Sequence, residues 1–226
     1  MTTTTYDDYL REQQVGEGLI PHSDGIYLLL SKEAYVPEAK RATSITMSGE
    51  TFQLDKSLSS LRTAVYHSPT RLIIAHRGTV PSDKADLLAD AAILTKTFPL
   101  SKRAKTSFKE AVAAHHKYPK LTVSNTGHSL GGATAQYVGY HFDLKNSKVV
   151  AFNPGSSPFN LMHNIKNWAF CKVFKKNTHC RKQRNQTLYA TAADPIAFGK
   201  IPFATIVKAE KLNPHSMENY IIDRPK

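Results

Sequence analysis

The chain is poor in the features that mark several classes of protein. Its 226 residues include two cysteines, one tryptophan, 11 glycines and 12 prolines. These counts exclude a disulfide-rich scaffold, a collagen-like chain and a low-complexity segment. The apolar runs are short as well. Ile26–Leu30 and Leu72–Ala75 are typical of them, whereas a membrane-spanning helix needs roughly 18 apolar residues. A chain of this length can instead bury a core that needs no covalent staple.

The first residues of the sequence do not have the pattern that is expected of a secretory signal. Met1–Leu10 is rich in threonine and contains two aspartates, where a signal would have basic residues followed by an apolar segment. Cys171 and Cys180 are too few for a disulfide framework. We therefore expect two reduced thiols in an intracellular protein, with a single disulfide as the alternative. The spacing of Cys171, His179 and Cys180 is not that of a structural zinc site, so we expect no metal.

Acidic residues are scarce relative to basic ones. The 18 aspartates and glutamates face 30 lysines and arginines, which gives a net charge of +12 and favours an anionic partner. Residues 166–184 contain seven basic side chains, three aromatic ones and no acid. This segment is either a solvated hairpin or a contact for anionic lipid head groups. Nucleic acid is disfavoured, because no known nucleic-acid module accompanies the charge. The candidate lipid contacts are Lys172, Lys175, Lys176, Arg181 and Lys182.

Hydrophobic periodicity predicts an α/β fold. One domain is expected over residues 1–226, because no repeat, linker or compositional break divides the sequence. From about Leu61 onward, apolar runs of strand length alternate with stretches of helical period, which predicts a mostly parallel sheet covered by helices. In the first 60 residues, Ile26–Leu30 is interpreted as a strand that a short helix precedes. The expected strands are 71–76, 121–125, 149–152 and 187–192, and the expected helices are 82–94, 101–117 and 130–142.

One motif indicates nucleophilic catalysis. Between an expected strand and an expected helix lies Gly127-His128-Ser129-Leu130-Gly131, a G-x-S-x-G sequence in the context of a nucleophile elbow. The elbow is too tight for side chains on its neighbours, so Gly127 and Gly131 let the strand approach the helix while Ser129 is forced into strained backbone angles. The alternative is a Gly-Ser turn that caps an ordinary helix.

A serine nucleophile needs a histidine base, which a carboxylate orients, and in this architecture the acid precedes the histidine in the chain. Of the aspartates after the serine, Asp143 lies about 20 Å away at the far end of the helix, and no histidine follows Asp223. Asp194 remains, directly after an expected strand, and His215 is the histidine that follows it. Glu210 is the rival acid in the right order.

Acyl transfer also requires two N–H groups directed at the oxyanion. The residue after the nucleophile, Leu130, provides one of them. The other is expected from the loop after the strand Arg71–His76, where Gly78 permits a turn and Thr79 offers an N–H and a hydroxyl. An ordinary glycine turn is the alternative for this loop.

Several motifs in order along the chain carry a family resemblance: IIAHRGT (73–79), TGHSLGGATAQ (126–136), FNPGSSP (152–158), ADPI (193–196) and HSMENY (215–220). On these motifs the sequence resembles the class 3 lipases, the family that contains the filamentous-fungal triacylglycerol lipases and many plant and microbial acylhydrolases. The resemblance covers about Leu61 to Tyr220, so residues 1–60 lie outside it. By position it implies an α/β-hydrolase fold and the same catalytic and oxyanion residues. It also implies a lid within Val80–Phe98, for which a fixed surface helix is the alternative, because the charge and helical period of this stretch fit both.

The motif and the charge together lead to one functional expectation. We expect a serine carboxylic-ester hydrolase that acts on lipid esters through Ser129, Asp194 and His215 without a metal or organic cofactor. The basic charge favours phospholipids over neutral glycerides and an anionic membrane surface as partner. A thioesterase, a peptidase and a non-enzymatic protein that binds an anionic surface are the alternatives, because a triad does not encode the leaving group.

Overall fold

A computed structural model describes the part of the chain that forms the sheet and its covering helices. The described residues are 3–5, 19–80, 90, 93, 97–142, 147–156, 166, 170–171, 185–191, 194–196, 204–207 and 213–223. Within them, nine strands form one sheet, and a short parallel pair, β2 (Leu19–Ile20) and β11 (Ile221–Ile222), lies beside it. The order in the sheet is β1 (Thr3–Thr5), β3 (Ser44–Met47), β4 (Glu50–Leu54), β5 (Thr63–His67), β6 (Arg71–His76), β7 (Thr122–His128), β8 (Lys148–Phe152), β9 (Gln186–Thr191) and β10 (Ala204–Val207).

The direction of the strands places several carboxyl ends at one edge of the sheet. Strands β6 to β10 are parallel, whereas β3, β4, β5 and β6 pair antiparallel in succession. The register sets His76 beside Gly127, His128 beside Phe152, and Phe152 beside Tyr189. The ends of four neighbouring strands therefore meet, which is where open α/β sheets bind their ligands. The mostly parallel sheet and its central strands confirm the prediction from periodicity.

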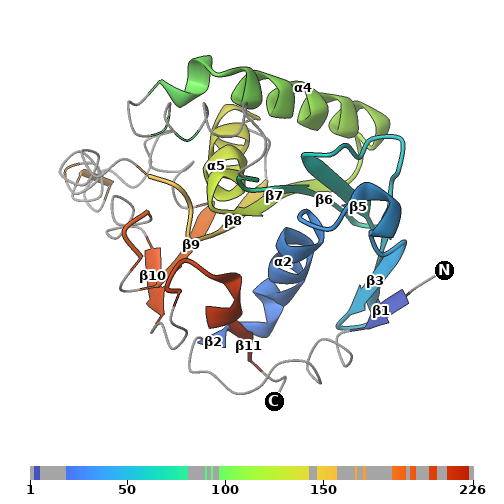
Figure 1. Cartoon of the computed structure of the whole chain (residues 1–226). Coiled ribbons are helices and arrows are strands. Elements are labelled where there is room, and N and C mark those ends of the chain that lie inside the picture. The colour runs from blue at the N-terminus through green and yellow to red at the C-terminus, as the bar shows by residue number, and fades with distance from the viewer. Residues whose placement is uncertain are drawn as a thin grey trace.

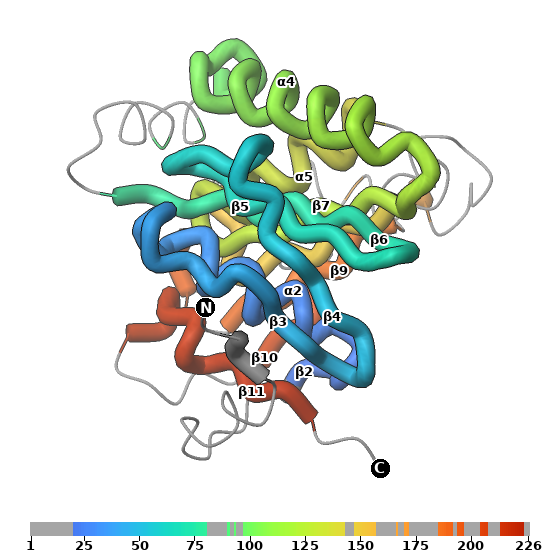
Figure 2. Tube along the Cα trace, turned by 90° about the vertical axis from the view of Figure 1, so that its right-hand side faces the viewer, coloured from blue at the N-terminus to red at the C-terminus, as the bar shows by residue number. Residues whose placement is uncertain are grey.

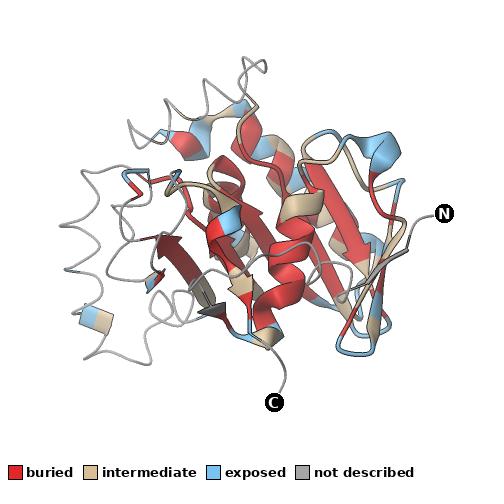
Figure 3. Cartoon of the chain, turned by 60° about the horizontal axis from the view of Figure 1, so that its bottom comes forward, coloured by how far each residue is buried: buried red, intermediate tan, exposed pale blue. Residues whose placement is uncertain are grey.

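Helices cover both faces of the sheet. Helices α4 (Lys102–Lys117) and α5 (Leu130–Phe142) lie on one face and α2 (His22–Glu33) on the other, as two views at right angles show (Figures 1 and 2). The side chains of β6 divide accordingly, because Ile73 joins the cluster around α2 while Leu72 and Ile74 join the cluster around α4 and α5. The central strands are buried along their length (Figure 3). Such burial on both faces explains their continuous apolar runs.

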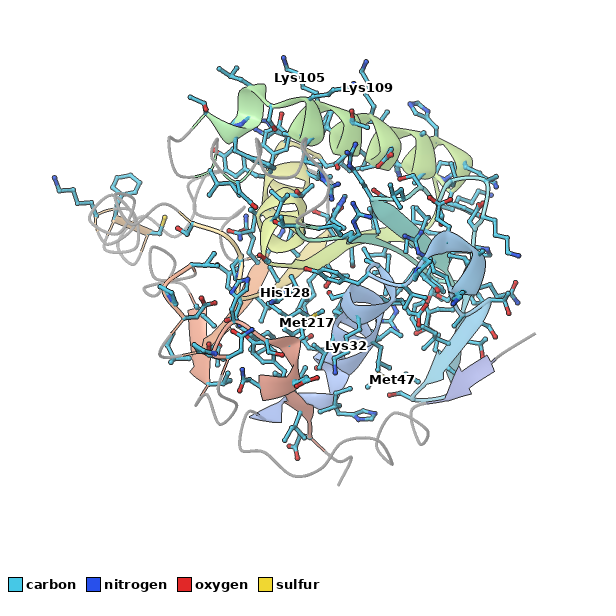
Figure 4. All side chains as sticks on the ribbon, in the orientation of Figure 1. Lys32, Met47, Lys105, Lys109, His128 and Met217 are labelled. Atoms are coloured by element: carbon cyan, nitrogen blue, oxygen red, sulfur yellow. The ribbon has the colours of Figure 1, made fainter. Side chains whose placement is uncertain are left out.

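Helix α4 shows how local sequence and packing agree. Ser101 caps its start, since the Ser101 Oγ accepts a hydrogen bond from the Ala104 N–H at 3.1 Å. Ala104 and Ala111 are both buried and lie about two helical turns apart on the same face. Lys105 and Lys109 are exposed and point away from the protein (Figure 4). The predicted helices at 101–117 and 130–142 are thus confirmed. The remaining short helices are η1 (Glu38–Lys40), η2 (Phe98–Leu100) and η5 (Met217–Asn219).

The interpretation of Ile26–Leu30 as a strand is wrong, because this run is the middle of helix α2. Every residue from Asp24 to Ser31 is buried, so the helix has apolar residues on all its sides and shows no amphipathic period. A short apolar run of that kind is compatible with a buried strand or a buried helix. The packing of α2 against the sheet decides between them, and the sequence could not.

The expectation of two reduced thiols is also wrong. Cys171 is disulfide-bonded, and Cys180 is the chain's only other cysteine. The spacing of two cysteines in the sequence does not determine whether their sulfur atoms come within bonding distance. Because disulfides are typical of oxidising compartments, the argument from reduced thiols for an intracellular protein fails. Within the described ranges, no helix is both long enough and apolar enough to cross a membrane.

Several predicted segments lie largely outside the described residues. In the expected helix 82–94 and the suggested lid Val80–Phe98, Asp90 and Ile93 are described, and both are helical. In the basic segment 166–184, Lys166 and Phe170 are described and exposed. The five candidate lipid contacts and the rival acid Glu210 lie outside the described residues.

A buried carboxylate makes the fold sensitive to acid. The Asp55 carboxylate accepts hydrogen bonds from the Ser57 hydroxyl at 2.7 Å, from the Lys117 ammonium at 2.6 Å and from the Tyr118 hydroxyl at 2.8 Å. Burial by itself raises the pKa of Asp55. The hydrogen bonds lower this pKa by more than burial raises it, so it lies well below its usual value. Asp55 therefore ties the loop after β4 to the end of α4 most strongly when it is ionised.

We expect Asp55→Asn to lower the free energy of unfolding by about 1–3 kcal/mol at pH 7. Because the folded pKa is depressed, the contribution of Asp55 is complete above the unfolded pKa of about 4 and is lost as the pH falls below it. Urea unfolding at pH 7 and pH 3.5 should thus show a smaller difference between variant and wild type at the lower pH. The exposed Glu38 offers a control, since Glu38→Gln should leave both values unchanged. An equal loss at both pH values would contradict the role of ionised Asp55.

Candidate active site

The nucleophile elbow is formed where β7 ends and α5 begins. Ser129 stands between them with a φ of 58°, a left-handed conformation that a residue with a side chain adopts only under constraint. Its N–H donates to the Phe152 carbonyl at 3.1 Å, and its carbonyl accepts from the Gly155 N–H at 3.0 Å. The neighbouring strand β8 and the loop that follows it thus hold the strained residue through both its N–H and its carbonyl.

The two glycines of the motif are required by the backbone around them. A Cβ atom on Gly127 would lie 2.5 Å from the Gly131 carbonyl, and one on Gly131 would lie 2.0 Å from the His76 carbonyl oxygen. Neither contact can be relieved by a rotating side chain, because the opposing atoms belong to the main chain. The glycines let α5 begin against the ends of β6 and β7, and this close approach sets the serine beside the loop that follows β6.

Asp194 and His215 meet across two loops. The His215 Nδ1 lies 2.7 Å from the Asp194 Oδ2, and the aspartate side chain is fully buried. A carboxylate can only accept, so Nδ1 donates the hydrogen, and the Nε2 of the neutral ring carries the lone pair. That Nε2 is buried and has no hydrogen-bond partner among the described residues. The Asp194 Oδ1 accepts from the Ile196 N–H at 2.9 Å, which fixes the orientation of the carboxylate.

The loop that carries His215 is fastened to the sheet through the preceding carbonyl. The Pro214 carbonyl accepts hydrogen bonds from the Asn153 side-chain amide at 3.2 Å and from the Thr191 hydroxyl. Asn153 is itself held, since its Oδ1 accepts from the Tyr220 hydroxyl at 2.7 Å and from the Thr191 N–H at 2.9 Å. The ends of β8 and β9 therefore set the position of the histidine loop.

The loop after β6 presents Thr79 toward the same space. The Thr79 hydroxyl donates to the Asp90 Oδ2 at 2.7 Å, so its single proton is engaged and the backbone N–H is the group left to face an oxyanion. Arg103 supports this loop from α4, because its guanidinium, which is fully buried, donates to the Arg77 carbonyl at 2.6 Å. Leu130, the other expected donor, is buried at the first turn of α5.

These groups surround one cavity of about 740 Å³. Thr79, Ser129 and His215 line it together, so the structure brings the proposed nucleophile, base and oxyanion loop to one space, with Asp194 directly behind the base. Tyr35 and Lys32 line another wall, and Figure 4 shows Lys32 and His128 on either side of Met217. The apolar part of the wall comes from Ile93, Ile196 and Met217.

The sequence does not predict several residues that line this cavity, among them Tyr35, Asp90 and Met217. Tyr35 lies in the turn after α2, two residues beyond its last residue Glu33, and Asp90 is helical but belongs to no motif. Met217 is the first residue of η5 and follows His215 by two positions. Of these three residues, Met217 has a signal in the sequence, because it lies inside the HSMENY motif.

Among the described residues, no group of three or more histidine, cysteine or acidic side chains is arranged to bind a metal ion.

A mostly parallel sheet with helices on both faces, and a strained serine between a strand and a helix at its carboxyl edge, define an α/β-hydrolase. Residues 67–160 match the class 3 lipases, which confirms the predicted relationship to that family over this part of the chain. The matching stretch is less than half of the chain. It contains Thr79, Ser129 and Leu130 and ends before Asp194 and His215. The match supports lipid-ester hydrolysis as the general activity. No curated protein matches the chain.

Proposed function

We propose that the chain is a serine carboxylic-ester hydrolase in which Ser129 is the nucleophile, His215 the base and Asp194 the orienting acid. The observation that carries this proposal is the 2.7 Å contact between the His215 Nδ1 and the Asp194 Oδ2, in a cavity that the strained Ser129 also lines. Because the contact fixes the tautomer of His215, its Nε2 is ready to accept a proton from the side of the cavity.

The reaction proceeds in two halves. His215 Nε2 takes the proton of the Ser129 hydroxyl while Oγ attacks the ester carbonyl carbon, and the resulting oxyanion is bound by the N–H groups of Thr79 and Leu130. Collapse of this intermediate breaks the bond to the alcohol, which leaves with the proton from His215. In the second half, His215 takes a proton from water, the hydroxide attacks the acyl carbon, and the fatty acid is released as Ser129 regains its proton.

Anionic phospholipids are the proposed substrates. The net charge of +12 supports this choice, since a positive protein concentrates at a negative lipid surface. Turnover of anionic phospholipid vesicles, triglyceride emulsion and a soluble short-chain ester, compared at low and high salt, tests the proposal. Preference for anionic vesicles that disappears at high salt supports it, whereas equal or better turnover of the triglyceride contradicts it.

The nucleophile is tested by labelling with a fluorophosphonate, which reacts with activated serines. We expect the wild-type protein to be labelled at Ser129 and to lose its esterase activity, and we expect Ser129→Ala to show neither labelling nor turnover above about 10⁻³ of the wild-type rate. Ser156→Ala is a suitable comparison for stability, because Ser156 is another serine of the same cavity wall. Failure of the wild type to react, or equal labelling of Ser129→Ala, would overturn the proposal.

A further inference from the structure

His128, the second residue of the G-x-S-x-G motif, is in contact with the proposed base. Its Nε2 lies 2.6 Å from the carbonyl oxygen of His215, and the centroids of the two rings are 4.7 Å apart. A carbonyl can only accept, so the Nε2 of His128 carries a hydrogen and donates it. The carbonyl of the base is thereby tied to the strand that ends at the nucleophile.

The other nitrogen of the His128 ring faces Tyr35. The Tyr35 hydroxyl lies 3.0 Å from the Nδ1 of His128 and 3.4 Å from the carbonyl oxygen of the same residue. Since the Nδ1 of the neutral ring carries a lone pair, the tyrosine hydroxyl donates to it. The same hydroxyl occupies the space beside Gly78, where a Cβ atom would lie 1.8 Å from it. Tyr35 therefore touches the oxyanion loop and, through His128, the loop of the base.

His128 also stays neutral beside a histidine that must become charged. Burial lowers its pKa, and the adjacent charge on protonated His215 lowers it further, to about 3. Over the range in which an ester hydrolase works, His128 thus keeps one hydrogen and one lone pair. A neutral ring against His215 does not repel the imidazolium that forms when the base accepts the proton of Ser129.

We propose that Tyr35 and His128 are positioning residues that align His215 for proton transfer from Ser129. The inference rests on the proposed function. The Pro214 carbonyl is fastened to the sheet by Asn153 and Thr191, and the next carbonyl, that of His215, is fastened by His128. Two successive anchors fix the direction in which the imidazole leaves the backbone. A small rotation of that peptide would move Nε2 away from the serine, and reaction rates fall steeply with such displacement.

Two amide substitutions distinguish the role of the Nε2 of His128 from that of its Nδ1. The amide nitrogen of glutamine reaches as far as Nε2 and retains the donor to the His215 carbonyl, whereas that of asparagine reaches only as far as Nδ1. We expect His128→Asn to lower kcat on a soluble ester by about tenfold or more, with KM within twofold, and His128→Gln to regain most of the loss. Rescue by the variant that keeps the donor would not follow from a role in packing alone.

Tyr35→Phe removes the second hydrogen bond, and Tyr27 in the preceding helix α2 offers a matched control. Tyr27 is buried and donates from its hydroxyl to the Ser124 hydroxyl at 3.3 Å, away from the cavity. We expect Tyr35→Phe to lower kcat severalfold with unchanged KM, and Tyr27→Phe to leave both constants unchanged, with melting temperatures recorded for each.

The closing experiment measures kcat, KM and the rate of fluorophosphonate labelling for wild type and all four variants of the full chain. Wild-type protein that is not labelled would overturn the proposed function itself. Labelled wild type with Tyr35→Phe and His128→Asn within twofold of its rate would overturn the positioning role. A loss of kcat in His128→Gln as large as in His128→Asn would likewise overturn the positioning role. The same holds for a loss of kcat in Tyr27→Phe as large as in Tyr35→Phe, since the loss would then reflect a general destabilisation of the protein.

Discussion

Replacing Asp194 by asparagine is expected to lower kcat for a soluble ester by about 10⁴-fold while the fold is retained. The amide can donate a hydrogen to the Nδ1 of His215, where the carboxylate only accepts. The neutral ring would then carry its hydrogen on Nε2, and the lone pair needed to take the proton of Ser129 would be lost. The measurement is kcat at pH 7–8 together with the melting temperature.

The exposed Asp223 provides the control for this substitution, because Asp223→Asn makes the same chemical change outside the cavity and should keep the wild-type kcat. If Asp194→Asn kept more than a tenth of the wild-type rate, Asp194 would not be the orienting acid. Glu210, the rival in the sequence, would then be the carboxylate to substitute next.

Gly131→Ala is expected to lower the free energy of unfolding by at least about 3 kcal/mol and to abolish turnover. The added Cβ would lie 2.0 Å from the His76 carbonyl oxygen and 2.8 Å from the Arg77 carbonyl carbon, so α5 must move away from β6. That movement displaces the elbow and the oxyanion loop together, because both are adjacent to this contact. Urea unfolding and kcat are the measurements.

Gly139→Ala is the matched control in the same helix. Its Cβ would meet the Cγ2 of Val149 at 2.2 Å, which is a side-chain atom that can shift when the valine rotates. Alanine gains the same intrinsic helix preference at both positions, so the difference between the two variants reports the backbone contact. Similar stabilities for Gly131→Ala and Gly139→Ala would show that the helix start can relax away from β6.

The elbow was predictable because its chemistry is local. Gly127, Ser129 and Gly131 are adjacent, and the strand before them and the helix after them are strongly patterned. Asp194 and His215 are distant in sequence, but the required order along the chain left few candidates. In the structure the Asp194 carboxylate and the His215 ring lie at hydrogen-bond distance.

The parts that sequence did not predict depend on packing. Tyr35 and His128 are 93 positions apart in the sequence. No local sequence pattern at either residue predicts the hydrogen bond between them. Helix α2 is apolar all round because it is buried, so its period gave no sign of a helix. The antiparallel pairing of β3, β4 and β5 likewise depends on contacts between strands, and no motif in the first 60 residues indicates them.

Helix α2 also limits what can be separated from the rest of the protein. Its buried Asp24 accepts a hydrogen bond from the Tyr189 hydroxyl at 2.7 Å and pairs with Lys148, so the helix is bound to β8 and β9. It covers a sheet face that includes Ile73 and Val150, both within the stretch that resembles the lipases. The residues that identify the family and the residues that make a stable folding unit are thus different sets. A fragment limited to residues 67–160 would expose that apolar face to water and should aggregate.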